Sequence, residues 1–229
     1  MTISRRAFFE TTATAVFAAA AFAAGTTLPA FAAVGAKDET VSTADLAVPG
    51  PLGDMVMGSD KAPVTIIEYA SMTCSHCAHF QSTTFPELKK RYIDTGKVRY
   101  ILREFPFEGD PVGLAGFMLA RCAGEKDKSR YFAFADLMLT KQNLLFSAPK
   151  DKVEDVLRGF AKQAGITDKG FDECLANQKI VDGIDSVRQR AMEKFGVDST
   201  PTFFINGKRV SGDQPIEKMA ELIDPYLKS

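Results

Sequence analysis

The hydrophobic pattern from residue 62 onward begins with a short apolar run, APVTIIEYA (62–70). The run is β-branched and aromatic, apolar on both faces and opened by Pro63, which is typical of a buried strand. Apolar residues then recur at mostly helical spacing, at Phe80, Phe85, Leu88 and Tyr92. Pro86 predicts a kink in this helix and Gly96 predicts its end, before a second strand over 98–105. The pattern therefore predicts a strand, a helix and a strand in succession.

Residues 106–199 show little strand character and three apolar helical faces. These faces lie in LAGFMLARCAG (114–124), VEDVLRGFAKQAG (153–165) and TDKGFDECLANQ (167–178). Apolar residues three and four positions apart indicate amphipathic helices. We therefore expect an all-helical insertion between the second strand and the last part of the chain.

The last part of the chain returns to strand character in STPTFFINGKRV (199–210). An apolar run, the turn dipeptide Asn206-Gly207 and a returning run together indicate a β-hairpin. PIEKMAELIDPYL (215–227) then places Ile216, Met219, Ala220 and Ile223 on one helical face. We expect two antiparallel strands followed by a C-terminal helix.

The N-terminal residues have the layout of an export signal. A basic start with Arg5-Arg6 is followed by a short Ala-rich apolar run and by small residues that suit cleavage after Ala32. The arginine pair resembles the twin-arginine signal, although such pairs also open ordinary secretory signals. We expect a cleaved signal over 1–32 and an oxidising compartment for the mature protein. Residues 33–60, rich in Pro and Gly, predict an extended arm.

Charge and composition exclude one class of partner. The chain has 28 Lys and Arg against 29 Asp and Glu, with a pI of about 6.2. Nucleic-acid-binding surfaces need clustered basic residues, and none stands out here. We expect no nucleic-acid partner.

The candidate chemistry lies in MTCSHCAHF (72–80), which holds two of the four cysteines and both histidines. Cys74 and Cys77 fall where the first strand turns into the helix. Unpaired N–H groups and the dipole of a helix N-terminus stabilise a thiolate, so Cys74 is expected to be the nucleophile. Cys77, one turn on, suits a resolving thiol, and the imidazole of His76 is expected to favour the Cys74 thiolate further.

Other interpretations of this cluster are weaker. A c-type haem needs His directly after the second Cys, where this chain has Ala78. Zinc or copper needs ligands around the ion, and four ligands within six residues could hardly surround it. An inert structural disulfide would close too short a loop to stabilise the fold much. We therefore expect redox chemistry, with no metal and no cofactor.

APVTIIEYASMTCSHCAHF, GVDSTPTFFINGKRV and the order of elements between them resemble the DsbA-like family of periplasmic thiol-disulfide oxidoreductases. The resemblance covers about 58–227 and implies an α/β thioredoxin fold with an inserted all-helical subdomain. The thioredoxin-like domain would comprise 61–106 and 186–229, and the insertion 107–185. It also implies a periplasmic monomer that acts on reduced or unfolded exported proteins and is reoxidised by a membrane partner of the DsbB type.

The resemblance assigns roles to particular residues. Cys74 is the implied nucleophile, Cys77 the resolving thiol, and Ser75 and His76 the pair that tunes the potential. Thr200 and Pro201 correspond to the cis-proline loop that faces the disulfide; from the sequence alone, Pro201 could equally be a plain strand-opening proline. The best-known oxidases have Pro-His between the cysteines and Val before the proline, whereas this chain has Ser-His and Thr. The Thr also occurs in relatives that isomerise disulfides.

Glu68 lies in the first strand, six residues before Cys74, between apolar neighbours. A buried carboxyl prefers its neutral form, so its pKa is expected to be raised. We interpret Glu68 as a proton acceptor for Cys77 as the disulfide opens, and the family carries an acidic residue at this spacing. The alternative is a partly exposed strand residue.

Cys122 and Cys174 lie on apolar helical faces of one predicted exported subdomain. We expect them to form a structural disulfide. The alternative is a pair of buried free thiols, which behave as small hydrophobic residues.

Three functions remain open at this point. The first is an oxidase that gives its Cys74–Cys77 disulfide to substrate thiols. The second is an isomerase or reductase kept reduced by an electron donor. The third is a non-catalytic module, either chaperone-like or metal-carrying, that keeps the fold without the chemistry.

Overall fold

The computed structural model describes residues 40–228. The predicted export signal (1–32), with its arginine pair and cleavage site, lies outside the described residues. Within 40–228, no helix is both long enough and apolar enough to cross a membrane.

A five-stranded mixed sheet lies at the centre of the described residues. Its strands are β1 (Met55–Gly58), β2 (Val64–Ala70), β3 (Val98–Glu104), β4 (Thr202–Ile205) and β5 (Lys208–Ser211). They lie in the order β1-β3-β2-β4-β5. β2 and β3 are parallel, and the other pairs are antiparallel.

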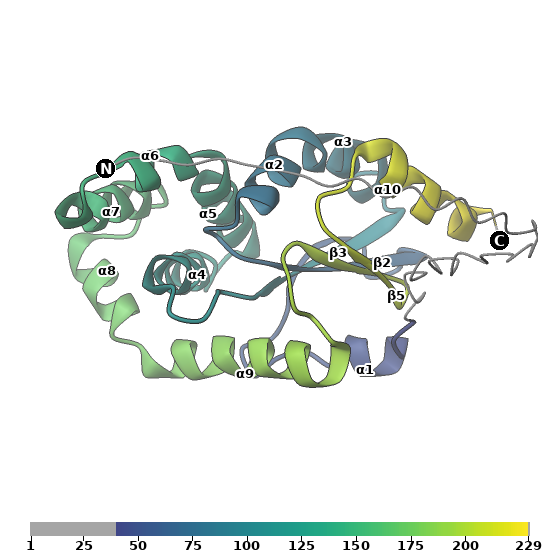
Figure 1. Ribbon diagram of the computed structural model, residues 1–229, viewed down its shortest axis with the longest axis horizontal. Helices are drawn as coiled ribbons and strands as arrows, with labels where there is room; N and C mark the ends of the chain where they lie inside the picture. Colours follow the sequence, from purple (N-terminus) through teal and green to yellow (C-terminus); the bar gives the residue numbers. More distant parts are fainter. Residues whose placement is uncertain (1–39, 229) are drawn as a thin grey trace, which may run out of the picture. The chain divides into compact units, whose positions relative to one another are not determined.

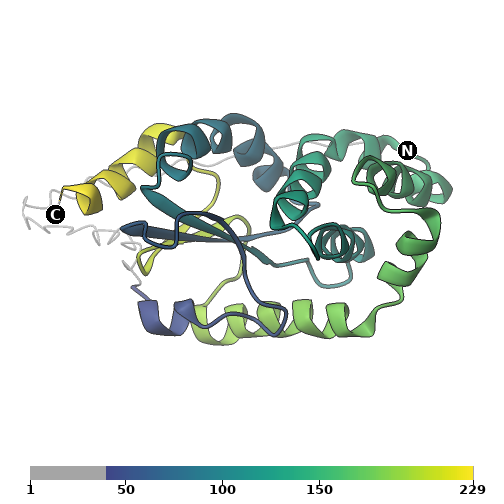
Figure 2. The same cartoon turned by 180° about the vertical axis from the view of Figure 1, so that it is seen from behind.

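Helices cover both faces of this sheet. They are α1 (Thr43–Ala47), α2 (Ser75–Thr83), α3 (Phe85–Leu88), α4 (Pro111–Ala123), α5 (Lys128–Thr140), α6 (Gln142–Ser147), α7 (Val153–Gln163), α8 (Asp168–Leu175), α9 (Gln178–Phe195) and α10 (Ile216–Ile223). Short π and 3-10 segments occur at η1 (Lys89–Ile93), η2 (Lys150–Lys152) and η3 (Asp224–Leu227). In Figures 1 and 2, α2, α3 and α10 lie on one face, α1 and α9 lie on the other, and α4 to α8 extend from one end.

Alternation along the central strands builds two cores, one on each face. Ile66 of β2 packs into the core beneath α2, whereas its neighbour Ile67 packs into the core against α9. Successive strand residues point to opposite faces, so a strand buried on both sides must be apolar throughout. Glu68 lies two residues after Ile66, so its side chain points to the same face of the sheet, the one covered by α2. Its carboxyl therefore points toward the Cys pair.

The predicted α/β fold with an all-helical insertion is confirmed, since every described element between β3 and β4 is helical. The helix after the Cys pair is interrupted near Pro86, as expected: α2 ends at Thr83 and α3 begins at Phe85. The predicted hairpin is also present. Asn206 and Gly207 both have positive φ, and Asn206 Oδ1 accepts from the Thr65 N–H at 2.8 Å.

The expectation of an extended arm over 33–60 is wrong for its second half. Met55–Gly58 forms β1, which pairs antiparallel with β3 at the sheet edge, and α1 precedes it. Two buried arginines hold this segment: Arg103 donates to the Leu46 carbonyl at 2.8 Å, and Arg121 donates to the Gly53 carbonyl at 2.9 Å. The sequence did not predict β1, because four residues are too few to show an alternation of apolar and polar positions. The two arginines that hold the segment lie about 50 or more residues further along the chain.

The expected domain boundary between residues 185 and 186 also differs from the structure. It falls inside α9, which runs without a break from Gln178 to Phe195. The helix packs Ile184 into the core beneath α2 and Val187 into the core on the other face. One continuous helix therefore serves both the insertion and the sheet.

Candidate active site

The turn between β2 and α2 places Cys74 immediately before the first residue of the helix. Cys74 is the N-cap residue of α2, with φ −78° and ψ 121°, and only 6% of it is exposed. The backbone N–H groups of His76 and Cys77 point at its sulfur and lower its pKa. This is the helix-terminus environment expected for a thiolate.

The two cysteines of the pair have opposite acid–base properties. The pKa of Cys74 is lowered to about 5, chiefly because the Cys77 thiol donates a hydrogen bond to its sulfur; desolvation opposes this, and Thr200 and the backbone N–H groups contribute further. Burial raises the pKa of Cys77 well above its ordinary value, and the bond to Cys74 and the charge of Glu68 add to the effect. Both cysteines are free in this structure. At neutral pH the reduced pair therefore holds one thiolate and one thiol.

The loop before β4 faces this pair from the other side. The Thr200–Pro201 peptide bond is cis, and the protonated Cys74 thiol donates to the Thr200 carbonyl oxygen at 3.3 Å. The Thr200 hydroxyl is buried beside the pair without a conventional hydrogen-bond partner. The structure thus brings Thr200 and Pro201 to Cys74 across 126 residues of sequence.

The dipeptide between the cysteines faces outward. Ser75 and His76 are both exposed, so a substrate can reach them. The sequence led us to expect that the His76 imidazole stabilises the thiolate. In the structure the contribution from His76 comes from its backbone N–H.

Glu68 lies beneath the pair and is 2% exposed, which excludes the alternative of a partly exposed strand residue. Desolvation raises its pKa to about 7, and the negative charges of Cys74 and Asp213 add to the rise. The hydroxyl of Tyr100 donates a hydrogen bond to its carboxylate and opposes that rise. A carboxyl with a pKa near 7 can both give and take a proton at neutral pH.

Three further contacts of this site were not predicted from the sequence. Gln142 of α6 donates to the carbonyls of Met72 at 2.8 Å and Cys74 at 3.0 Å, and so ties the insertion to the active-site turn. His79 of α2 pairs with Asp213, which precedes α10. Tyr100 contacts Glu68. If the two predicted strands are paired in parallel, Tyr100 can be placed on the same face of the sheet as Glu68. No local pattern in the sequence identifies Gln142.

Cys122 and Cys174 form a disulfide that joins α4 to α8, with sulfur atoms 2.04 Å apart. It lies in the insertion, separate from the Cys74–Cys77 turn. In residues 40–228, no group of three or more His, Cys, Asp or Glu side chains is arranged to hold a metal ion.

We expect the thiolate absorbance of the reduced protein to rise with an inflection near pH 5, because Cys74 ionises there while Cys77 stays protonated. Since the folded pKa lies below the unfolded one, ionisation stabilises the reduced fold; this stabilisation is complete above pH 9 and is lost as the pH falls toward 5. The C74S variant should lack the inflection. An inflection at about 8.5, the ordinary cysteine value, would contradict the site geometry.

Comparisons with known proteins agree with this arrangement. The Thioredoxin family profile matches residues 52–225. A putative protein-disulfide oxidoreductase from Rickettsia felis is 33% identical over 175 residues, which cover 76% of this chain and 60% of the relative. A probable disulfide bond formation protein D from Bacillus cereus is 29% identical over 174 residues, or 75% and 78% of the two chains.

A solved structure is similar to this chain in both fold and sequence. The crystal structure of Wolbachia pipientis alpha-DsbA1 superimposes with a TM-score of 0.73 at 32% identity, and the match covers 82% of this chain and 97% of that one. The chain spans about three fifths of the Rickettsia relative's length. The family profile and this match show that the chain belongs to the thioredoxin family, as a DsbA-like member.

Proposed function

We propose that the protein is a thiol-disulfide oxidoreductase that gives the Cys74–Cys77 disulfide to the thiols of substrate proteins. The observation that carries the proposal is the asymmetry of the pair: Cys74 at the helix terminus, whose pKa is lowered to about 5, lies beside the fully buried Cys77, whose pKa is raised. Whatever stabilises the reduced form makes the disulfide a stronger oxidant. The names of the Rickettsia and Bacillus relatives support the same activity.

The reaction takes two exchanges. A substrate thiolate attacks Cys74 Sγ and forms a mixed disulfide, while Cys77 leaves with the bonding electron pair and takes a proton. A second substrate thiolate then attacks the substrate sulfur of the mixed disulfide and releases Cys74. Thiols of low pKa leave faster, which favours Cys74 as the departing group. The substrate loses two electrons, and the protein gains them as its dithiol.

We propose that Glu68 donates a proton as the disulfide opens, rather than accepting one as the sequence led us to expect, because the pKa of Cys77 is raised. Cys77 leaves as a thiolate when the disulfide opens, so Glu68 must donate a proton in that direction. It accepts the proton when the disulfide is formed again. Its pKa of about 7 suits both directions near neutral pH.

Replacing Glu68 with glutamine should slow the opening of the disulfide by at least about tenfold at pH 6, because an amide cannot donate the proton and water must replace it. The fold should survive, since the raised pKa of Glu68 means that its ionisation destabilises the native state as the pH rises from 4.5 through 7. Stopped-flow reduction by a small thiol measures the rate. An unchanged rate across pH 5–8 would exclude the proton-transfer role.

We propose that an extended substrate segment pairs with the backbone at Thr200. The Thr200 carbonyl oxygen lies 3.3 Å from Cys74 Sγ, and a strand added there would bring a substrate sulfur to the attacking position. The exposed Ser75 and His76 would lie under that segment, and we propose that they tune the redox potential of the cysteine pair.

We propose export to the periplasm, by the twin-arginine route, because residues 1–32 have that layout. Reoxidation would come from a membrane partner of the DsbB type. The protein would act as a monomer on reduced or unfolded exported proteins.

Transfer to a reduced, unfolded test protein distinguishes the oxidase from the alternatives. The oxidised protein should form about one substrate disulfide per molecule without another oxidant and end as the dithiol. An isomerase or a reductase kept reduced would instead act on a scrambled or an oxidised substrate. A non-catalytic module would do neither, and that result would refute the proposal.

A further inference from the structure

Tyr100 is a buried residue that contacts Glu68 from the neighbouring strand. It lies in β3, opposite Ile66 in the parallel register with β2, and it is 1% exposed. Its hydroxyl donates a hydrogen bond to Glu68 Oε2, two residues further along β2. Hydrogen bonds to an ionised acceptor are stronger than neutral ones and favour the ionised form.

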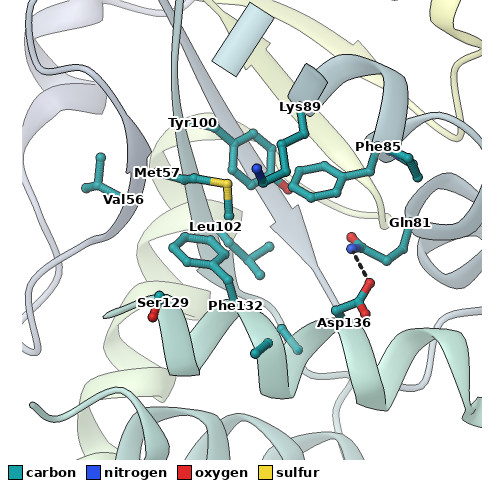
Figure 3. A pocket seen from close by; sticks show the side chains of 13 residues that line it. Val56, Met57, Gln81, Phe85, Lys89, Tyr100, Leu102, Ser129, Phe132 and Asp136 are labelled. Atoms are coloured by element: carbon teal, nitrogen blue, oxygen red, sulfur yellow. Dashed lines mark hydrogen bonds between the residues drawn. The ribbon is translucent and has the colours of Figure 1, made fainter. Parts of the chain in front are cut away.

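The aromatic surroundings hold the Tyr100 ring in place. Its centroid lies 5.1 Å from that of Phe85 in α3 and 6.3 Å from that of Phe132 in α5. Figure 3 shows the ring beside Phe85, with Phe132 and Leu102 nearby, in the wall of a pocket of about 600 Å³. The Tyr100 ring packs against the aromatic neighbours, and its hydroxyl contacts Glu68. The hydroxyl oxygen can therefore be removed without disturbing the packing of the ring.

We propose that Tyr100 is a positioning residue that fixes the Glu68 carboxyl and thereby sets the pH range in which Glu68 exchanges a proton with Cys77. The inference rests on the proton-transfer role given to Glu68 under the proposed function. The Tyr100 hydroxyl donates its hydrogen bond to Glu68, so Tyr100 acts on the cysteine pair through that carboxyl.

The ionisable groups around Glu68 come from four parts of the fold. They are Tyr100 in β3, Cys74 and Cys77 at α2, Tyr131 in α5, and Asp213 between β5 and α10. The charges of Cys74 and Asp213 oppose ionisation of Glu68, whereas the Tyr100 hydroxyl favours it. Burial and the charge of Glu68 raise the pKa of Tyr100 well above its ordinary value, so the hydroxyl remains a donor throughout the neutral range.

The Tyr100→Phe variant tests this role, because it removes the hydroxyl and keeps the ring. Without that donor, Glu68 should ionise at higher pH. The rate of disulfide opening, expressed per substrate thiolate, depends on protonated Glu68 and falls as the pH rises through the inflection of Glu68, whose pKa is raised by burial. In Tyr100→Phe we expect this inflection to move upward by about one pH unit.

Tyr131→Phe provides a matched control. Tyr131 is also fully buried, and its hydroxyl donates to another buried carboxylate, Glu104, at 3.0 Å. Removing this hydroxyl costs a comparable hydrogen bond without altering the donor to Glu68. Its inflection should match that of the unmodified protein. An equal displacement in both variants would show a general effect of loosening the core and would overturn the proposal.

Glu68→Gln separates the two possible failures. If this variant retains the inflection, the proton-transfer role is wrong and the inference fails with it. If Glu68→Gln loses the inflection, but the inflection of Tyr100→Phe lies at the same pH as in the unmodified protein, only the role of Tyr100 is refuted. A carboxyl ¹³C titration of Glu68 in the oxidised protein measures the same change in the pH at which Glu68 ionises. It needs no turnover, so it also works for a variant whose disulfide opens slowly.

Discussion

The C74S variant should lose disulfide exchange altogether, while C77S should still form a mixed disulfide when its Cys74 thiolate attacks a substrate disulfide. Cys74 is the sulfur held as a thiolate and facing Thr200, whereas Cys77 is buried and protonated. Without Cys74 no mixed disulfide forms. Without Cys77 the mixed disulfide at Cys74 cannot be released by the protein's own second thiol.

Non-reducing electrophoresis and mass spectrometry of each variant with a substrate peptide disulfide measure both outcomes. C77S should accumulate an adduct of protein plus one peptide, and C74S should show none. Circular dichroism of both variants controls for folding. An adduct at Cys77 in the C74S variant, formed as fast as that of C77S, would reverse the assigned roles.

Removing the Cys122–Cys174 disulfide should lower the free energy of unfolding by about 4 kcal/mol, by the chain-entropy estimate for residues 52 positions apart. The bond joins α4 to α8 inside the insertion, away from the turn that carries Cys74. The double Cys→Ala variant should therefore unfold at lower denaturant concentration and keep most of its exchange activity.

Denaturant unfolding of the oxidised double variant against the unmodified protein gives this difference. C74S/C77S is the control, because it removes a buried pair of cysteines without opening the long loop. A loss below about 1 kcal/mol would mean that the insertion is held by its core alone. A loss of exchange without a loss of stability would point to an unexpected coupling between the two cysteine pairs.

Local patterns were sufficient for the elements that carry the chemistry. The apolar run before the cysteines predicts β2, and the position of Cys74 where this strand turns into a helix predicts a nucleophile there. Both predictions depend on neighbouring residues alone. The Asn206-Gly207 turn was equally readable, because positive φ at both positions selects these residue types. The helical insertion followed from three apolar faces.

The parts that could not be predicted depend on partners distant in sequence. β1 is only four residues long and is recognisable through its pairing with β3. Gln142 reaches the Cys74 carbonyl from 68 residues away, and nothing around it indicates that role. The direction of proton transfer at Glu68 required the acidity of Cys77, which burial determines and the motif alone does not reveal.

The redox equilibrium of the protein with glutathione tests the central claim most directly. A disulfide donor whose reduced form is stabilised by the Cys74 thiolate should have a potential near the oxidising end of the known range, at about −120 mV. A potential of about −270 mV, as in thioredoxin, would mean that the dithiol is the better reductant. That result would contradict the assignment of this protein as a disulfide donor.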